Sequence, residues 1–124
     1  MYTSMNRSAA NAYRQVGVQS VVDGASPHML IQMLFDALET SLNAAKGAMQ
    51  RGDIEEKGRQ IGKAVRILEE GLKASLNLNQ GGEVAQNLAS LYDYSITQIT
   101  LANLRNDSSL LESAQTVIAP VAQG

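Results

Sequence analysis

Few side chains in this sequence could do chemistry. The 124 residues include one histidine, His28, and no cysteine, which rules out multi-histidine and thiolate metal sites and disfavours a histidine-dependent triad. The acidic pairs Glu55-Glu56 and Glu69-Glu70 are adjacent residues, so each pair diverges around a helix instead of converging on a substrate. With Lys57 and the other charges of the same stretch, they predict a solvated face. We therefore expect no catalytic, metal or cofactor site, and a protein that is not an enzyme.

His28 leaves one catalytic alternative, a histidine-phosphotransfer module, because such a module needs only one histidine on a four-helix bundle. Its histidine lies mid-helix beside a lysine and a glycine, whereas His28 follows Pro27 in the first turn of a predicted helix. We expect an exposed first-turn side chain, and phosphoryl transfer from a response regulator would reveal the alternative. A di-iron bundle is excluded, because Ala25 stands where a Glu-x-x-His pair needs its glutamate.

Composition indicates a single globular domain. Hydrophobic residues make up 44% of the chain, and the formal net charge of −2 lacks the basic surplus that a phosphate backbone attracts. Aromatic residues make up only 4%, too few for base-stacking platforms. No apolar run approaches the roughly 20 residues that span a bilayer, and the N-terminus lacks the apolar core of a secretory signal. We expect a cytoplasmic protein that binds neither nucleic acid nor membrane.

Turn residues divide the chain into an N-terminal segment, 1–25, and four helices. Ser26 precedes a proline and Asp53 precedes a glutamate by three residues, so both read as helix N-caps. The polar stretches Asn79–Gly82 and Asn106–Ser109 separate the later helices. Short loops favour antiparallel neighbours. We predict an all-α, antiparallel four-helix bundle with an N-terminal capping segment and helices over about 27–50, 53–77, 83–104 and 108–120.

The predicted helices carry more apolar surface than a bundle core needs. The first two each have a seam of large residues in 4-3 spacing and a second apolar stripe, which in the second helix is built mainly from small residues. The second stripe either packs against a further helix of the bundle or faces outward to receive a partner helix. Glycine within a helix costs about 0.5–1 kcal/mol relative to alanine, so the glycines of the second helix indicate close packing. We assign to a partner groove Leu30, Leu34, Ala64, Ile67, Gly71, Ala74, Leu88 and Tyr92.

Residues 1–25 contain enough valine and tyrosine to lie on the bundle, but their spacing is too irregular for a fifth bundle helix. We predict that this segment caps apolar surface and is joined to the bundle through Asp23-Gly24. Tyr13 is its expected anchor, with a fixed core position as the alternative.

Several strings, taken in order and spacing, resemble one known family over nearly the whole chain. They are NAYRQV (11–16), ASPHMLI (25–31), MLFD (33–36), RGD (51–53), GGEVA (81–85), NL (87–88), LYDY (91–94) and ANLRND (102–107). Together they resemble the flagellin-specific export chaperones, the FliS family. The chain departs from the family at its last residues, where members commonly carry a tryptophan and a polar tail.

The resemblance implies a bundle in the bacterial cytosol that binds the disordered C-terminal segment of flagellin, which folds into helices around it. Such a chaperone prevents premature filament polymerisation and supports delivery of flagellin to the cytosolic domain of the type III export gate, without ATP or metal. The family's N-terminal tyrosine, here Tyr13, belongs to a segment that packs on the bundle and moves when the client binds. A self-associating helical scaffold is the alternative, which mass measurement with and without flagellin would distinguish.

Overall fold

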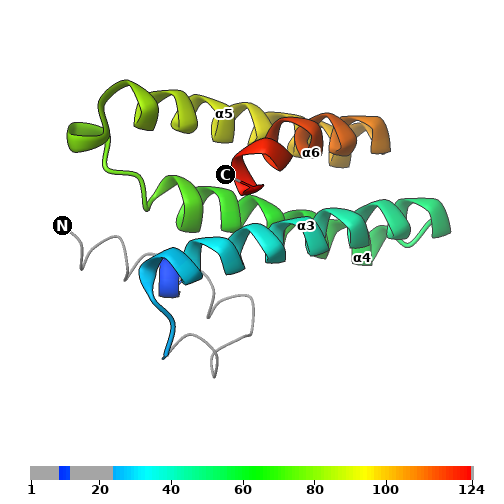
Figure 1. The fold of residues 1–124 in the computed structure, drawn as a ribbon. Coiled ribbons are helices and arrows are strands. Elements are labelled where there is room, and N and C mark those ends of the chain that lie inside the picture. Colours follow the sequence, from blue (N-terminus) through cyan, green and yellow to red (C-terminus); the bar gives the residue numbers. More distant parts are fainter. Residues whose placement is uncertain (1–8, 12–23, 124) are drawn as a thin grey trace.

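The computed structural model describes residues 9–11 and 24–123. In this part of the chain every regular element is helical, and consecutive long helices run antiparallel (Figure 1). The predicted all-α bundle is thereby confirmed. Its elements are α3 (Pro27–Arg51), α4 (Ile54–Arg66), η1 (Ile67–Lys73), α5 (Leu78–Arg105) and α6 (Ser108–Gln123).

Local capping sets the first helical hairpin. The Ser26 hydroxyl accepts a hydrogen bond from the Met29 backbone N–H at 3.2 Å, which fixes the start of α3. α3 ends at Gly52, whose φ of 71° lies in the left-handed region that glycine adopts without steric cost. The Asp53 carboxylate then accepts from the Glu56 N–H at 3.1 Å and begins α4. Only Gly52 and Asp53 separate the two helices, so α4 must fold back along α3.

The second helix is not one regular helix. The sequence predicts a continuous helix over 53–77, but after α4 the chain forms the π-helical segment η1. Just after this segment, both the hydroxyl and the N–H of Ser75 donate to the Gly71 carbonyl, at 2.6 and 3.2 Å. A π-helix has more residues per turn than an α-helix, so it changes the direction in which the following side chains point. The buried residues of η1 are Ile67, Leu68, Gly71 and Leu72, a spacing that fits either helix type.

The last two helices are longer than predicted. α5 begins at Leu78, yet Gly82, with φ 58° and ψ −134°, kinks it just before the predicted start at residue 83. α6 continues past Pro120 to Gln123, whereas the sequence predicts an end near residue 120. Proline lacks the N–H donor and its ring crowds the carbonyl four residues earlier, yet the helix keeps its last residues beyond Pro120.

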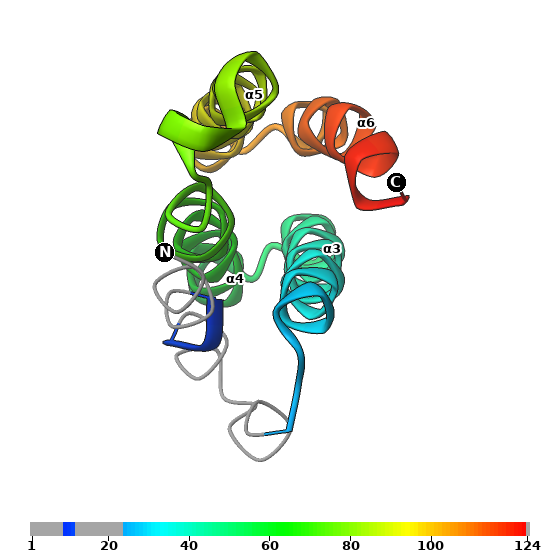
Figure 2. The same cartoon turned by 60° about the vertical axis from the view of Figure 1, so that its left-hand side comes forward.

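The core lies between two helical pairs, α3 with α4 and α5 with α6, seen nearly end-on in Figure 2. Residues 9–11 are helical and lie against the α3–α4 side of the bundle, at the end where α3 begins (Figures 1 and 2). Ala9 is 1% exposed and belongs to the core. Thus part of the predicted capping segment packs on the bundle, while Tyr13 lies outside the described residues. Within those residues, no helix combines the length and apolar character that crossing a membrane requires.

Candidate partner-binding site

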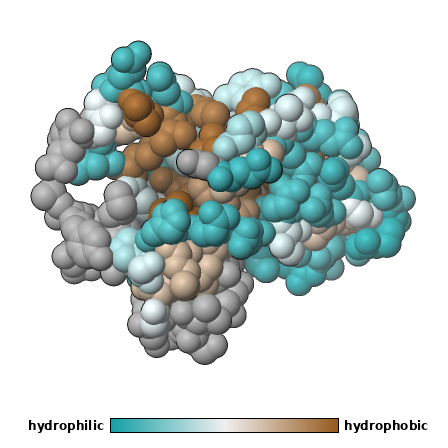
Figure 3. All heavy atoms as spheres, in the orientation of Figure 1, coloured by the Kyte–Doolittle hydropathy of each residue, from teal (hydrophilic) through white to brown (hydrophobic). Residues whose placement is uncertain are grey.

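An apolar groove of about 210 Å³ lies at one end of the bundle. Hydrophobic side chains gather on this face between α5 and α3 (Figure 3). Four parts of the fold contribute: α3, η1 with the turn after it, α5 and α6. The lining residues are Ile31, Phe35, Leu72, Ser75, Leu76, Leu88, Tyr92 and Val121.

The antiparallel topology brings these residues together. The starts of α3 and α5 and the ends of η1 and α6 meet at the same end of the bundle. α3 and α5 each present two lining residues four positions apart, Ile31 with Phe35 and Leu88 with Tyr92. Residues at this spacing share one face of a helix. The groove is therefore a direct product of helix order and register.

The groove has a buried floor and partly exposed walls. Phe35, Leu72 and Tyr92 are buried, whereas Leu88 and Val121 are half-buried. The same line on α5 extends one turn outward to Val84, which is 69% exposed. This end of the bundle thus leaves apolar surface that the described core does not use, as a site for an amphipathic helix requires.

An ion pair stands beside the groove. The Lys73 ammonium lies 2.7 Å from the Asp93 carboxylate and joins η1 to α5 next to the lining residues Leu72 and Tyr92. The hydrogen bond to Asp93 is the main cause that raises the pKa of Lys73. Both side chains are well exposed, so the pair contributes little to stability.

The residues assigned to a partner groove from the sequence divide into three groups. Leu88 and Tyr92 line the groove. Ala74 is exposed. The others are buried in the bundle: Leu30, Leu34, Ala64, Ile67 and Gly71. Their contact with a partner stays a prediction, as does that of Tyr13.

Sequence reasoning missed most of the groove. Ile31, Phe35, Leu72 and Val121 line it, but none of them was assigned to a partner groove. The first three lie on the seams of large residues in the first two predicted helices. The signal that could have found them is their position. Ile31 and Phe35 lie in the N-terminal part of α3, and Leu72 and Val121 lie near the ends of η1 and α6, which meet at one end of the antiparallel bundle.

The glycines of α4 do not serve close packing within the described part of the chain. A Cβ built on Gly58 or Gly62 would meet no atom within 4 Å. Internal packing therefore does not explain these two positions, and the cost of helical glycine there has no compensating contact in this fold.

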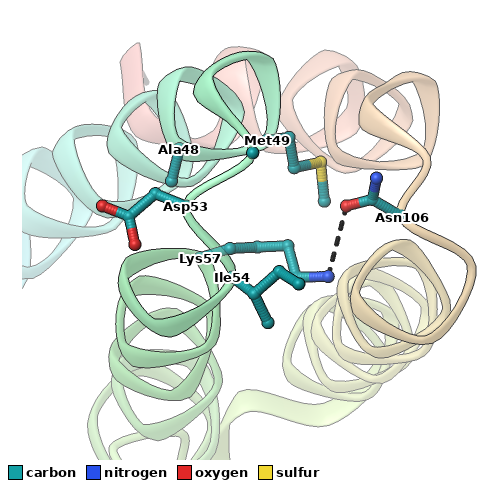
Figure 4. Close-up of a pocket in the computed structure, with 7 residues that line it drawn as sticks. Ala48, Met49, Asp53, Ile54, Lys57 and Asn106 are labelled. Carbon is teal, nitrogen blue, oxygen red and sulfur yellow. Dashed lines mark hydrogen bonds between the residues drawn. The ribbon is translucent and has the colours of Figure 1, made fainter.

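The opposite end of the bundle holds a buried cation. Lys57 is 7% exposed, and its Nζ donates to the Asn103 carbonyl at 3.2 Å. It also donates to Asn106 Oδ1 at 3.2 Å, the bond marked in Figure 4. These acceptors lie at the C-terminal end of α5, where a positive charge is favourable. The expectation that Lys57 belongs to a solvated face is therefore wrong, because the side chain is buried. Its hydrogen-bond partners lie 46 and 49 residues away in the sequence. A pocket of about 130 Å³ adjoins it.

The remaining candidates for chemistry are solvated. His28 is exposed in the first turn of α3, and Glu55, Glu69 and Glu70 are exposed. Within the described ranges, no cluster of histidine and carboxylate side chains could hold a metal ion. What the arrangement offers is an apolar binding surface.

Known proteins resemble this chain over nearly its whole length. Residues 9–124 match the model of a family described as "Flagellar protein FliS". The flagellar secretion chaperone FliS of Salmonella typhimurium is 44% identical over 123 residues, which cover 99% of this chain and 89% of the relative. The flagellar secretion chaperone FliSB of Pseudomonas aeruginosa is 42% identical over 116 residues, 94% and 91% of the two chains. The flagellar secretion chaperone FliS of Vibrio cholerae is 39% identical over 115 residues, which cover 93% of this chain and 84% of the relative.

Proposed function

Because the chain belongs to the FliS family of flagellar secretion chaperones, we propose that it binds the disordered C-terminal segment of flagellin in the bacterial cytosol. Binding keeps flagellin from polymerising prematurely and supports its delivery to the flagellar type III export gate. The observation that carries this proposal is the apolar groove, whose half-buried walls come from α3, α5 and α6.

The groove supports a mechanism in which the client folds as it binds. A disordered segment that becomes helical pays an ordering cost of about 2–5 kcal/mol or more. Apolar surface buried against the groove offsets that cost at roughly 25 cal/mol per Å². An amphipathic helix with apolar residues at i, i+3 or i+4, and i+7 fits between walls that are themselves helices.

The proposed activity consists of binding alone. Apolar segments that drive filament assembly are covered while they lie in the groove, so polymerisation requires their release. Binding must therefore be reversible, because the export gate has to receive flagellin from the chaperone. No step in this cycle calls for a reacting side chain.

Calorimetry combined with circular dichroism tests the proposal. We expect full-length flagellin and a peptide of its C-terminal segment to bind one-to-one, with a gain of helix for the peptide. Flagellin without that segment should not bind. Absence of binding, or binding without helix gain, would contradict coupled folding.

Two matched variants locate the site. Leu88→Asp places a charge on the groove wall, and we expect at least a tenfold loss of affinity. Leu104→Asp places the same charge at the other end of α5, where Leu104 is 80% exposed, and should bind as the wild type does. Thermal melting of both variants verifies folding. Equal losses for the two would place the client elsewhere.

Sedimentation separates the chaperone from a self-associating scaffold. A chaperone gains the mass of one flagellin and keeps its own mass unchanged on dilution. A scaffold shows concentration-dependent self-association that Leu88→Asp abolishes, and gains no mass from flagellin.

A further inference from the structure

Among the described residues that line the groove, Tyr92 carries a hydroxyl without a hydrogen-bond partner in the described part of the chain. Ser75 and Tyr92 are the two polar residues of its lining. The Ser75 hydroxyl donates to the Gly71 carbonyl at 2.6 Å. Tyr92, only 3% exposed, makes no hydrogen bond to any residue that the structure describes.

The Tyr92 hydroxyl is nevertheless not sealed in the core. Among the described residues, the buried side-chain oxygen that lacks a hydrogen bond belongs to Glu56, which pairs with Arg59 instead. Tyr92 is not among such residues, and its side chain lines the groove. Burial of the side chain raises the pKa of Tyr92 to about 12. The group therefore stays neutral near pH 7 and can donate a hydrogen bond.

A wholly apolar occupant would be penalised at this point. In the empty groove, water can satisfy the hydroxyl, but a helix that fills the groove displaces that water. A buried donor left without a partner weakens binding, whereas a partner on the occupant removes the penalty.

We propose that Tyr92 is a specificity-determining residue whose hydroxyl donates to a neutral side-chain acceptor placed among the apolar residues of the bound flagellin segment. This inference rests on the proposed function and specifies its client. The acceptor is an Asn or Gln carbonyl, or a Ser or Thr hydroxyl. A carboxylate is disfavoured because the described residues of the groove lining include no cation, and the neighbouring Lys73 is already paired with Asp93 at 2.7 Å.

Tyr92→Phe tests the role of the hydroxyl, with Tyr94→Phe as the matched control. Tyr94 is on the same helix, is 46% exposed and does not line the groove. We expect Tyr92→Phe to bind the flagellin peptide about 5- to 20-fold more weakly than the wild type, and Tyr94→Phe to bind normally. Tyr92→Phe should melt at or above the wild-type temperature, because its hydroxyl makes no bond within the described fold.

A double-mutant cycle identifies the acceptor. Each Asn, Gln, Ser and Thr of the peptide is replaced by Ala in turn and tested against both proteins. One replacement should weaken binding to the wild type but leave binding to Tyr92→Phe unchanged.

The outcomes separate the two proposals. If the peptide does not bind the wild type, the proposed function and this inference both fail. If the peptide binds the wild type and Tyr92→Phe equally well, the inference alone is overturned. The same holds if the loss of binding free energy from every peptide replacement adds to the loss from Tyr92→Phe.

Discussion

At the scale of single residues, Lys57 links two elements distant in the sequence. Its buried ammonium joins the start of α4 to the end of α5 through two hydrogen bonds. Because the acceptors lie at a helix C-terminus, the partial negative charge there compensates for burial of the cation. The residue stabilises the bundle end that lies away from the groove.

Lys57→Met should lower the free energy of unfolding by about 1.5–3 kcal/mol, because the aliphatic stem is kept while both charge-assisted hydrogen bonds are lost. Urea denaturation measures the change. Lys63→Met is the control, since Lys63 makes no hydrogen bond within the described residues, and it should cost much less. Flagellin affinity should be unchanged in both variants. A loss of affinity in folded Lys57→Met would place client contacts at this end.

The hydrogen bonds of Asp107, just before α6, should make the stability of the fold depend on pH. Its carboxylate accepts from the Ser109 hydroxyl at 2.6 Å and from the Ser109 N–H at 3.0 Å. These bonds, the hydroxyl first, hold the pKa of Asp107 below its ordinary value of 3.8. A lowered carboxyl pKa adds stability above pH 3.8, and that stability is lost as the pH falls through the lower pKa of the folded state.

Asp107→Ala should therefore destabilise the protein at pH 7, and the difference from the wild type should shrink below about pH 4. Urea denaturation at a series of pH values measures it. Ser109→Ala, which removes one of the two donors, should give a smaller effect with the same pH trend. A difference that stays constant down to pH 2 would contradict this assignment.

Residues that act locally could be read from the sequence, and residues that act at a distance could not. Ser26 and Asp53 cap helices through bonds to backbone groups three residues ahead, so a short string suffices to recognise them. Lys57 stands among alternating charges that look like a solvated surface. Its burial depends on how the two helical pairs pack, which the local sequence does not encode.

At the scale of elements, Gly82 divides α5. Its φ of 58° and ψ of −134° lie outside the helical region and separate the first turn from the long part of the helix. A Cβ at this position would meet no atom within 4 Å. Any cost of a side chain there is thus backbone strain rather than a clash.

Gly82→Ala should destabilise the fold by about 1 kcal/mol or more. Gly58→Ala is the control, because Gly58 lies within α4 with open space around a Cβ, and it should stabilise the fold by about 0.5–1 kcal/mol. Thermal denaturation of the pair measures both signs. If Gly82→Ala were as stable as the wild type, the kink would not be a fixed feature of α5.

The existence of the helices was predictable, but their irregularities were not. Caps and polar loops marked four helices because they act within a few residues. The π-helical segment η1 escaped prediction since Ile67, Leu68, Gly71 and Leu72 are spaced equally well for an α-helix. The end of α6 was predicted too early because a proline usually marks the end of a helix. In the structure the last turn of α6 tolerates the missing N–H donor of Pro120.

At the scale of the whole molecule, the apolar surplus was predictable, and most of its location was not. Periodicity shows which face of each helix is apolar, but not which end of the bundle leaves that face uncovered. The seam residue Phe35 belongs to the core as expected and also lines the groove with Ile31, whereas Leu30 and Leu34, which were assigned to the groove, are buried. The arrangement of four helix ends decides this, and it requires the fold.

Site-specific photo-crosslinking tests the central claim most directly, namely that flagellin occupies this groove. A photoreactive amino acid is placed at Leu88 or Val121 on the groove walls, and at Leu104 at the opposite end as the control. We expect crosslinks from Leu88 and Val121 to the C-terminal segment of flagellin, and none from Leu104. Crosslinks from Leu104 alone, or to another part of flagellin, would contradict it.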